Sequence, residues 1–425
     1  MNTTELKKYI LSDQPDELLK KIIGCDDLEA EKKRYITLID EALERYGDGD
    51  YHFISSPGRS EIGGNHTDHQ HGNVVAASLN MDNLVIVKAN GSNIVNYRDG
   101  DYVIAGLDIS SLDPRADEIN SSKSLVRGIA ARLEQLGYKY GGFDALCNSR
   151  VLVGSGISSS ACFEVMLVEI FNLLFNDEAI SDVERAKIGQ YAENVYFGKP
   201  SGLLDQMAIS VGGFVAIDFK NPDDPAIENY DFSFTDHGYQ FFLVDTKGDH
   251  SDLSHEYAAV TEEIKEVAKV LGVKYLADSP REKFFDNFAS IREKVKNDRA
   301  MLRASHFYYE NERAVKEKEA IRDDDIAELL KLMKKSGRSS FEYLQNVYPV
   351  SRVNSQSLSI GLSLADNYLD GQGAYRVHGG GFEGTIQVIV PDELADGFKA
   401  TMTAVFGEDC LMPVKIRPFG TITVI

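Results

Sequence analysis

The stretch VGSGISSSA, residues 153–161, lies between a strand-like apolar run and a mostly apolar helical pattern. Gly154 and Gly156 allow the backbone to turn tightly and to approach a ligand closely. The serines at 158–160 place N–H groups and hydroxyls at the start of the helix, where the helix dipole favours an anion. The stretch therefore predicts a phosphate-binding loop, and an ordinary serine-capped helix after a glycine turn is the alternative.

Other phosphate-binding signatures are missing from this stretch. It has neither the lysine of a P-loop nor the GxGxxG of a dinucleotide-binding fold. On either side of it we expect a strand over 143–153 and a buried helix over 161–175, because both runs are apolar. A phosphate-binding loop of this kind connects a strand to the N-terminus of a helix through a glycine turn.

Residues 57–72, PGRSEIGGNHTDHQHG, form a second polar and glycine-rich segment. Closely spaced histidine and aspartate side chains are metal-ligand types. A loop that alternates donors and acceptors also suits a polyhydroxyl ligand, because each hydroxyl both donates and accepts. From these residues alone, a solvated polar loop is the third alternative.

Two further features lie toward the C-terminus. Residues 371–385, GQGAYRVHGGGFEGT, hold six glycines before an apolar strand, and so many glycines cost too much chain entropy to be simple filler. They predict a close approach of backbone to a ligand or to another loop. Asp205 lies in PSGLLDQM, which we expect to be a short loop between a helix and a strand, and an ordinary helix cap is its alternative role.

The remaining chain divides by pattern. Residues 1–48 have the spacing of polar amphipathic helices, and 53–103 consist of short β-branched runs separated by Gly, Asn and Asp, which predicts a mainly antiparallel sheet. A polar, proline-containing link predicts a domain boundary near 220–240. Beyond it, most of 253–346 is expected to be helical, and 410–425 is expected to be strand-like.

Composition excludes several classes of protein. The 425 residues include 45 Lys and Arg against 67 Asp and Glu, a formal charge of -22, which disfavours nucleic acid and anionic membranes as partners. The four cysteines show no CxxC pair or ligand-like spacing, so neither a disulfide framework nor a zinc site is expected. Charges interrupt the N-terminal segment, and no run reaches the roughly 18 apolar residues of a membrane span. We therefore expect a cytoplasmic protein that is neither exported nor anchored.

Taken in order, these segments resemble the motifs of the GHMP kinase superfamily, and within it those of the galactokinases. GRSEIGGNHTDHQHG (58–72) resembles GRxNxIGEHTDYxxG, and LVGSGISSSA (152–161) resembles PxGSGLSSSA. GAYRVHGGGFEGT (373–385) resembles GARxTGAGFGG, and AENVYFGKPSGLLDQ (192–206) is similar to AExxxxGxxCGxMDQ. The resemblance extends over about residues 40–420.

The resemblance implies an α+β, two-domain GHMP kinase fold. It pairs an N-terminal mixed sheet with helices and a C-terminal ferredoxin-like α/β sandwich, with the active site in the cleft between them. On this sequence it implies a helical lead-in over 1–48, an N-terminal kinase domain with the sugar-binding and phosphate-binding loops over 49–225, and a C-terminal domain over 226–425.

The implied reaction is ATP-dependent phosphorylation of galactose at its anomeric hydroxyl, which gives galactose 1-phosphate. Asp205 would face that hydroxyl and Arg59 would lie beside it, and a neighbouring cation keeps a carboxylate ionised. Such a carboxylate is a weak proton acceptor. It suffices where the phosphoryl transition state is loose, because positioning and charge neutralisation then dominate.

The implied cofactors are ATP and Mg²⁺. Ser160 and Glu193 would hold the metal, which prefers oxygen ligands. A solvated helix carboxylate is the alternative for Glu193. The expected ATP contacts are Gly154, Ser155, Gly156, Ser158, Ser159 and Ser160. The expected sugar contacts are Asn65, His66, Asp68, Gly202 and Tyr257.

Four departures from the galactokinase pattern matter for the site. Asn65 stands where the family has a glutamate thought to grip the sugar's 6-hydroxyl, Glu61 stands where it has asparagine, His69 replaces a tyrosine and Glu383 replaces a glycine. The loss of charge at Asn65 motivates a kinase for a related sugar, a galacturonate or N-acetylgalactosamine, as an alternative. A regulator that binds galactose and ATP without turnover is another. We expect a monomer whose partners are galactose, or a close relative, and MgATP.

Overall fold

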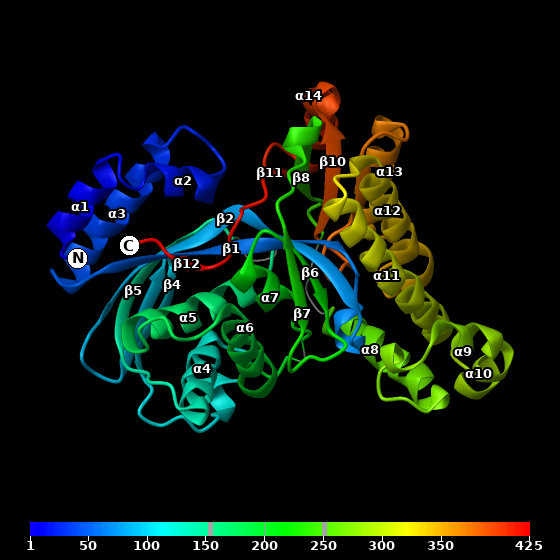
Figure 1. Ribbon diagram of the computed structural model, residues 1–425, viewed down its shortest axis with the longest axis horizontal. Helices are drawn as coiled ribbons and strands as arrows, with labels where there is room; N and C mark the ends of the chain where they lie inside the picture. The colour runs from blue at the N-terminus through cyan, green and yellow to red at the C-terminus, as the bar shows by residue number, and fades with distance from the viewer. Residues whose placement is uncertain (152–155, 200, 249–252) are drawn as a thin grey trace.

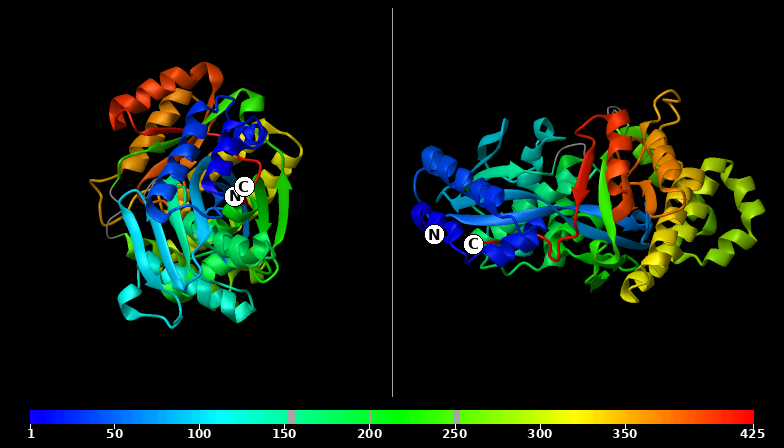
Figure 2. Two further views of the ribbon diagram at one scale, coloured as in Figure 1. Left: turned by 90° about the vertical axis from the view of Figure 1, so that its left-hand side faces the viewer. Right: turned by 90° about the horizontal axis from the view of Figure 1, so that it is seen from above.

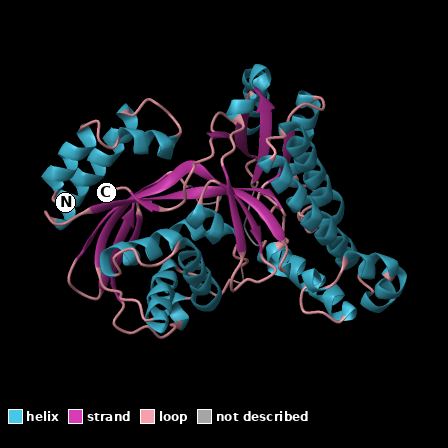
Figure 3. Ribbon diagram, in the orientation of Figure 1, coloured by secondary structure: helices cyan, strands magenta, loops and turns pink. Residues whose placement is uncertain are grey.

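The computed structural model describes residues 1–151, 156–199, 201–248 and 253–425. Within these ranges the chain forms two sheets with helices packed against them (Figures 1 and 3). The predicted ATP contacts Gly154 and Ser155 lie outside the described residues. Among the helices in those ranges, none has both the length and the apolar character that crossing a membrane requires.

The larger sheet is mixed. Its eight strands are β1 (His52–Gly63), β2 (Asn73–Ala89), β3 (Ile94–Asp99), β4 (Tyr102–Asp108), β5 (Phe143–Ser149), β6 (Phe214–Asp218), β7 (Ala226–Tyr230) and β12 (Ile422–Thr423). They run in the order β12-β1-β2-β5-β3-β4, with β6 paired to β2 and β7 to β6. The pairing of β3 with β5 is parallel and the other pairings are antiparallel. The predicted N-terminal mixed sheet is therefore confirmed.

Helices cover both faces of this sheet (Figure 1). One face carries α1 (Thr3–Leu11), α2 (Asp16–Ile23) and α3 (Glu29–Tyr46), and the other carries α4 (Ser122–Leu136), α5 (Ser159–Phe175), α6 (Asp182–Tyr191) and α7 (Leu204–Val211). Strand β2 is apolar on both sides: Leu84 and Ile86 pack with α1 to α3, whereas Val85 and Val87 pack with α4 and α5. Successive side chains of a strand point to opposite faces, so a continuous apolar run fits a strand that is covered twice.

The smaller sheet is entirely antiparallel. It contains β8 (Tyr239–Asp245), β9 (Ala374–Val377), β10 (Thr385–Pro391) and β11 (Leu411–Val414) in the order β11-β8-β10-β9. The remaining helices are α8 (Ser254–Leu271), α9 (Arg281–Asp286), α10 (Phe288–Val295), α11 (Asp298–Arg322), α12 (Ile326–Ser339), α13 (Ser357–Leu369) and α14 (Ala395–Phe406). Seen from above, α8 to α12 lie at the end of the molecule opposite the two termini (Figure 2).

Two register shifts in β1 set the direction of its polar side chains. The register of β1 against β2 shifts between Pro57 and Arg59 and again between Glu61 and Gly63. Such bulges twist a strand and redirect its side chains, and they are common beside active sites. Arg59 and Glu61 thus lie on a buried strand that is bent on either side of them.

The structure also departs from the sequence-based expectations. Strand β7 lies inside the polar link that the sequence marks as a boundary, and 410–425 forms two short strands joined by irregular backbone. The prediction that Asp205 lies in a loop is wrong, because Leu204 and Asp205 begin α7. Strands β7 and β12 come after residue 225 and join the larger sheet. The domain limits at 48 and 225 remain a prediction.

Candidate active site

Arg59 and Asp205 form a two-pronged ion pair. Arg59 comes from bulged β1 and Asp205 from the first turn of α7. The distance from Arg59 Nε to Asp205 Oδ1 is 2.6 Å, and Nη2 to Oδ2 is 2.8 Å. Arg59 Nη1 also donates to the Gly156 carbonyl over 2.6 Å, which ties the pair to the serine-rich loop. Burial raises the pKa of Asp205, but the Arg59 charge and hydrogen bonds outweigh it and hold that pKa below its usual range.

Ser158 completes the surroundings of this aspartate. Its backbone is left-handed, with φ of 63°, immediately before α5 begins. The conformation turns its hydroxyl to Asp205 Oδ2, to which it donates a hydrogen bond. Both oxygens of Asp205 therefore have donors in the ligand-free protein, so an entering hydroxyl group would compete with Ser158. Its expected role as an ATP contact stays a prediction.

Glu193 and Ser160 lie close together beside this pair. Glu193 belongs to a π-helical turn, Ala192–Phe197, that continues α6. Ser160 Oγ lies 3.5 Å from Glu193 Oε1, and Lys199 Nζ lies 3.1 Å from the same oxygen. Ser201 Oγ and Gln206 Nε2 donate to Glu193 Oε2 over 2.5 Å and 2.9 Å. A hydroxyl and a buried carboxylate next to each other fit a small oxygen-seeking cation such as Mg²⁺.

Asp68 packs directly on Gly202. A Cβ atom at Gly202 would overlap the Asp68 carboxylate, so this close approach requires glycine. Asp68 accepts hydrogen bonds from the His69 N–H over 2.8 Å and the Leu204 N–H over 3.5 Å. Burial and the nearby charge of Asp205 raise the pKa of Asp68 to about 6. Residues 58–72, called the first motif from here on, thus meet the start of α7 at two carboxyl groups, those of Asp68 and Asp205.

The backbone carbonyls at 380 and 381 accept hydrogen bonds from the first motif and from α8. His66 Nε2 lies 3.0 Å from the Gly380 carbonyl, and the hydroxyl of Tyr257 donates to the Gly381 carbonyl over 2.9 Å. A carbonyl only accepts, so His66 Nε2 carries the proton. Burial lowers the pKa of His66 and raises that of Tyr257 to about 12, so both side chains are neutral at pH 7. The structure brings both residues against the third glycine-rich segment.

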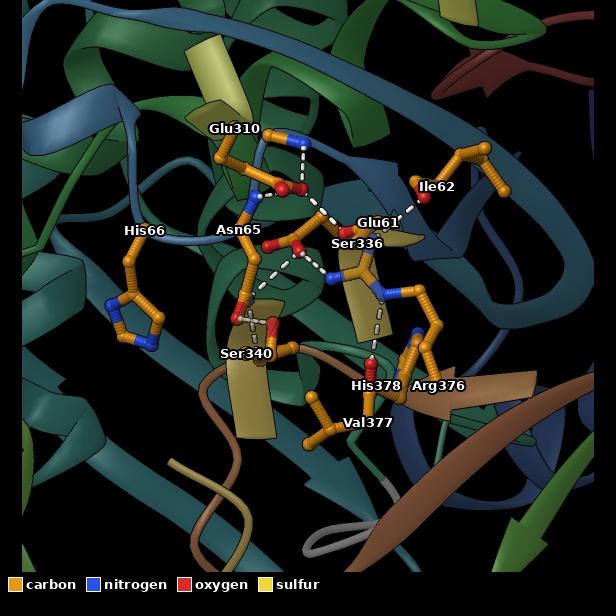
Figure 4. A network of polar contacts seen from close by, with 12 residues as sticks. Glu61, Ile62, Asn65, His66, Glu310, Ser336, Ser340, Arg376, Val377 and His378 are labelled. Atoms are coloured by element: carbon orange, nitrogen blue, oxygen red, sulfur yellow. Dashed lines mark hydrogen bonds and ion pairs between the residues drawn. The ribbon is translucent and has the colours of Figure 1, made fainter. Parts of the chain in front are cut away.

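Asn65 is enclosed by protein (Figure 4). Its side-chain Nδ2 donates to Glu61 Oε1 over 2.8 Å and to the Gly379 carbonyl over 2.9 Å. Its Oδ1 accepts from Ser340 Oγ over 3.1 Å and from Asn346 Nδ2 over 3.0 Å. An amide side chain has two N–H donors and two acceptor positions, and here all are used. Asn65 is 1% exposed, and its expected role as a sugar contact stays a prediction.

Arg376 neutralises Glu61 beneath Asn65 (Figure 4). Arg376 is fully buried, and its Nη2 lies 2.8 Å from Glu61 Oε1. Its remaining donors reach the carbonyls of Ile62 and Val377. Sequence reasoning missed this arginine, although it lies inside the glycine-rich 371–385 segment. An arginine in a segment predicted to approach a ligand or another loop closely was the available signal, because a charge that such an approach buries requires a partner.

A second layer from α11 and α12 holds the backbone of the first motif. Glu310 Oε1 accepts from the Gly64 N–H over 3.1 Å and from the Ser336 hydroxyl. His306 Nε2 donates to the Asn65 carbonyl over 2.9 Å. Sequence reasoning missed these residues too, because nothing in the helical pattern distinguishes a buried Glu or His that meets a loop more than 200 positions away.

His69 and His71 separate in the structure. The His71 ring stacks on Tyr275 with 3.5 Å between centroids, whereas His69 lies beside His66 at 5.9 Å. Among the described residues, no group of three or more His, Cys, Asp or Glu side chains is arranged to hold a metal ion. In the described structure, the histidines of this loop therefore do not form a ready-made metal centre.

Comparison with known proteins supports the fold. Residues 124–213 match the family model of the GHMP kinases N terminal domain, and residues 43–89 match the galactokinase galactose-binding signature. A galactokinase of Clostridium tetani is 28% identical over 368 residues, which cover 84% of this chain and 89% of that protein. A galactokinase of Actinobacillus pleuropneumoniae is also 28% identical, over 80% of this chain and 85% of its own length.

Comparison with solved structures supports the same fold. Lactococcus lactis galactokinase complexed with galactose matches with a TM-score of 0.77 at 22% identity, covering 90% of this chain and 98% of that one. Methanococcus jannaschii mevalonate kinase matches with a TM-score of 0.56 at 15% identity, over 87% of this chain and 99% of that one. The predicted α+β GHMP kinase fold is confirmed.

Proposed function

From a chain that has the GHMP kinase fold and resembles galactokinases over most of its length, we propose a galactokinase, which transfers the terminal phosphoryl group of ATP to the anomeric hydroxyl of galactose. The observation that carries the proposal is the Arg59–Asp205 pair, with distances of 2.6 and 2.8 Å. An ionised carboxylate held in a fixed orientation can orient a hydroxyl group and accept its proton.

Asp205 acts as this acceptor. The sugar's anomeric hydroxyl replaces the Ser158 hydroxyl at the carboxylate and transfers its proton to Asp205 as its oxygen bonds to the γ-phosphorus of ATP. The bond from that phosphorus to the bridging oxygen breaks at the same time, and ADP leaves with this oxygen. Arg59 keeps the carboxylate charged beforehand and offers positive charge beside the transferring group. Little basicity is required, because phosphoryl transfer through a loose transition state depends mainly on alignment and charge neutralisation.

The sugar's other hydroxyls lie against the first motif. Asp68 is a partly buried acceptor beside Gly202, and His66 is a neutral imidazole held by the Gly380 carbonyl. A carboxylate and a neutral imidazole together provide acceptor and donor atoms for hydroxyl groups. Tyr257 closes the same region from α8 through its bond to Gly381.

The nucleotide phosphates lie at the start of α5, where Gly156, Ser158 and Ser159 precede or begin the helix. Gly154 and Ser155 belong to the same proposed phosphate loop. Ser160 and Glu193 would hold Mg²⁺, which neutralises phosphate charge when it is bound. The 3.5 Å between their oxygens supports this assignment. A monomer acting in the cytoplasm remains a prediction.

A kinase for a related sugar is the second candidate, and Asn65 favours it. The side chain at this position carries no charge and makes its hydrogen bonds to protein atoms. A carboxylate or an acetamido substituent would therefore meet no buried negative charge from residue 65. The third candidate, a regulator without turnover, shares the fold but transfers no phosphate.

One experiment separates the three candidates. ADP release is measured with galactose, glucose, N-acetylgalactosamine, galacturonate and arabinose, and the product is identified by ³¹P NMR. A galactokinase gives its highest kcat/KM with galactose and an anomeric phosphate signal. Higher kcat/KM with galacturonate or N-acetylgalactosamine identifies the related kinase. Galactose binding by calorimetry without ADP release identifies the regulator.

A further inference from the structure

Lys199 brings a positive charge to the proposed metal position. It lies between the π-helical turn and α7, at a position that the AExxxxGxxCGxMDQ pattern leaves open. Its Nζ lies 3.1 Å from Glu193 Oε1, the same oxygen that faces Ser160. An ammonium group and a metal ion at the same carboxylate oxygen repel each other, so each weakens the binding of the other there.

The two partners differ in how freely they can move. The Glu193 side chain is 4% exposed and is held by Ser201 and Gln206, whereas the Lys199 side chain is 60% exposed. A buried carboxylate requires a compensating partner. A lysine ammonium on a flexible four-carbon stem can supply that charge and can also leave.

Two other acidic side chains lie near Lys199. Asp205 and the buried Glu164 act on Lys199 together with Glu193; burial lowers the pKa of Lys199, and these carboxylates raise it above its usual value. Gln206 Nε2 bridges Glu164 and Glu193 at 2.9 Å from each. Burial and the charge of Glu193 raise the pKa of Glu164 well above its usual value. Asp205 is paired with Arg59, so Glu193 is the carboxylate whose charge Lys199 balances.

We propose that Lys199 is a stand-in cation: its ammonium neutralises Glu193 in the nucleotide-free protein and moves to the nucleotide phosphates when a divalent metal takes its place. The proposal rests on the proposed kinase function. It makes Lys199 a nucleotide-binding residue in the loaded enzyme and a competitor of the metal in the empty one. Removing it should therefore affect metal and nucleotide in opposite directions.

The test is a binding cycle without turnover. Calorimetry measures the dissociation constant of AMP-PCP, a non-hydrolysable ATP analogue, once with EDTA and once with Mg²⁺, for wild type and Lys199→Met. In EDTA the variant should bind about tenfold more weakly, because the charge of Glu193 then repels the nucleotide phosphates with no cation beside it. The gain from Mg²⁺, expressed as the ratio of the two constants, should be several-fold larger in the variant than in wild type.

Lys187→Met is the matched control. It removes the same charge from neighbouring α6, where the ammonium bonds the Asp223 carbonyl, and it should reproduce both wild-type constants. A Mg²⁺ gain that is equal in wild type and Lys199→Met overturns the proposal, as does equal weakening of both constants with a lowered Tm, which is what a structural role gives. Wild-type protein that binds no AMP-PCP under either condition overturns the proposed kinase function as well.

Discussion

The Asn65 amide donates to the Glu61 carboxylate over 2.8 Å, and the same carboxylate oxygen pairs with fully buried Arg376. In the pattern GRxNxIGEHTDYxxG the asparagine stands at position 61 and the glutamate at 65, so the acid and the amide have exchanged places in this chain. One negative charge is kept, but it has moved from the loop to the strand and next to Arg376.

Asn65→Glu should therefore destabilise the protein. It places a second buried carboxylate against Glu61 and removes the two hydrogen bonds that Nδ2 donates. We expect the free energy of unfolding to fall by about 3 kcal/mol, measured by urea denaturation followed by circular dichroism.

The double variant Glu61→Asn, Asn65→Glu is the control for this exchange. Each single change leaves a charge without its partner, whereas the double change restores one acid and one amide, so it should recover more than half of the lost stability. Additive losses would show that the two side chains do not form a unit. In the double variant, KM for galactose compared with galacturonate then tests whether residue 65 contacts C6.

Asp205→Asn should abolish turnover and leave galactose binding nearly unchanged. The amide has the same shape but is a poor proton acceptor and has lost its charge beside Arg59. Single-turnover kinetics should give less than about a tenth of the wild-type rate, a barrier increase above ~1.4 kcal/mol. Retention of a larger fraction contradicts the assigned role.

Asp68 should make sugar binding sensitive to acid. Its pKa of about 6, raised by burial and by Asp205, means that the acceptor form is lost as pH falls through 6. The KM for galactose should rise below that pH, and Asp68→Asn should flatten the profile at a constant, higher KM. The assay covers pH 5 to pH 8, and a wild-type KM that stays constant over this range contradicts the assignment.

The same pKa has a consequence for stability. The folded protein binds this proton more tightly than the unfolded chain, whose aspartates titrate near about 3.9. Between these values the folded state holds more protons, so stability falls as pH rises from about 4 to about 6. Asp68→Asn should then raise the free energy of unfolding at pH 7.5 by about 2 kcal/mol, and the difference should disappear near pH 4. No such gain would mean that Asp68 is not desolvated.

Gly202→Ala should weaken galactose binding through Asp68. The added methyl group overlaps the Asp68 carboxylate and has to displace it. Calorimetry should show at least a tenfold loss of affinity in the wild-type background, about 1.4 kcal/mol, and little further loss in Asp68→Ala. Equal losses in both backgrounds would show that Gly202 acts independently of Asp68.

The local parts of the site could be predicted from the sequence, and its long-range partners could not. Glycines and serines before an apolar helix have a direct physical meaning, so the turn into α5 and the helix itself were predictable. Arg376 and Glu310 bind residues that are remote in sequence, and these partners follow from the packing of β9 and α11 against residues 61–64 rather than from any local pattern. The sequence predicts a loop at Asp205 because the short α7 follows a glycine-containing segment that resembles a turn.

The three carbonyls at 379–381 also bear on how the protein is made. Those of Gly379 and Gly380 accept from Asn65 and His66, residues synthesised 314 positions earlier. At a synthesis rate of roughly 5–20 residues per second, tens of seconds pass between the synthesis of residues 58–72 and the appearance of these acceptors. A nascent chain therefore holds polar groups that are buried in the folded protein without their partners for most of its synthesis, and the loop of residues 58–72 becomes ordered among the last parts of the molecule.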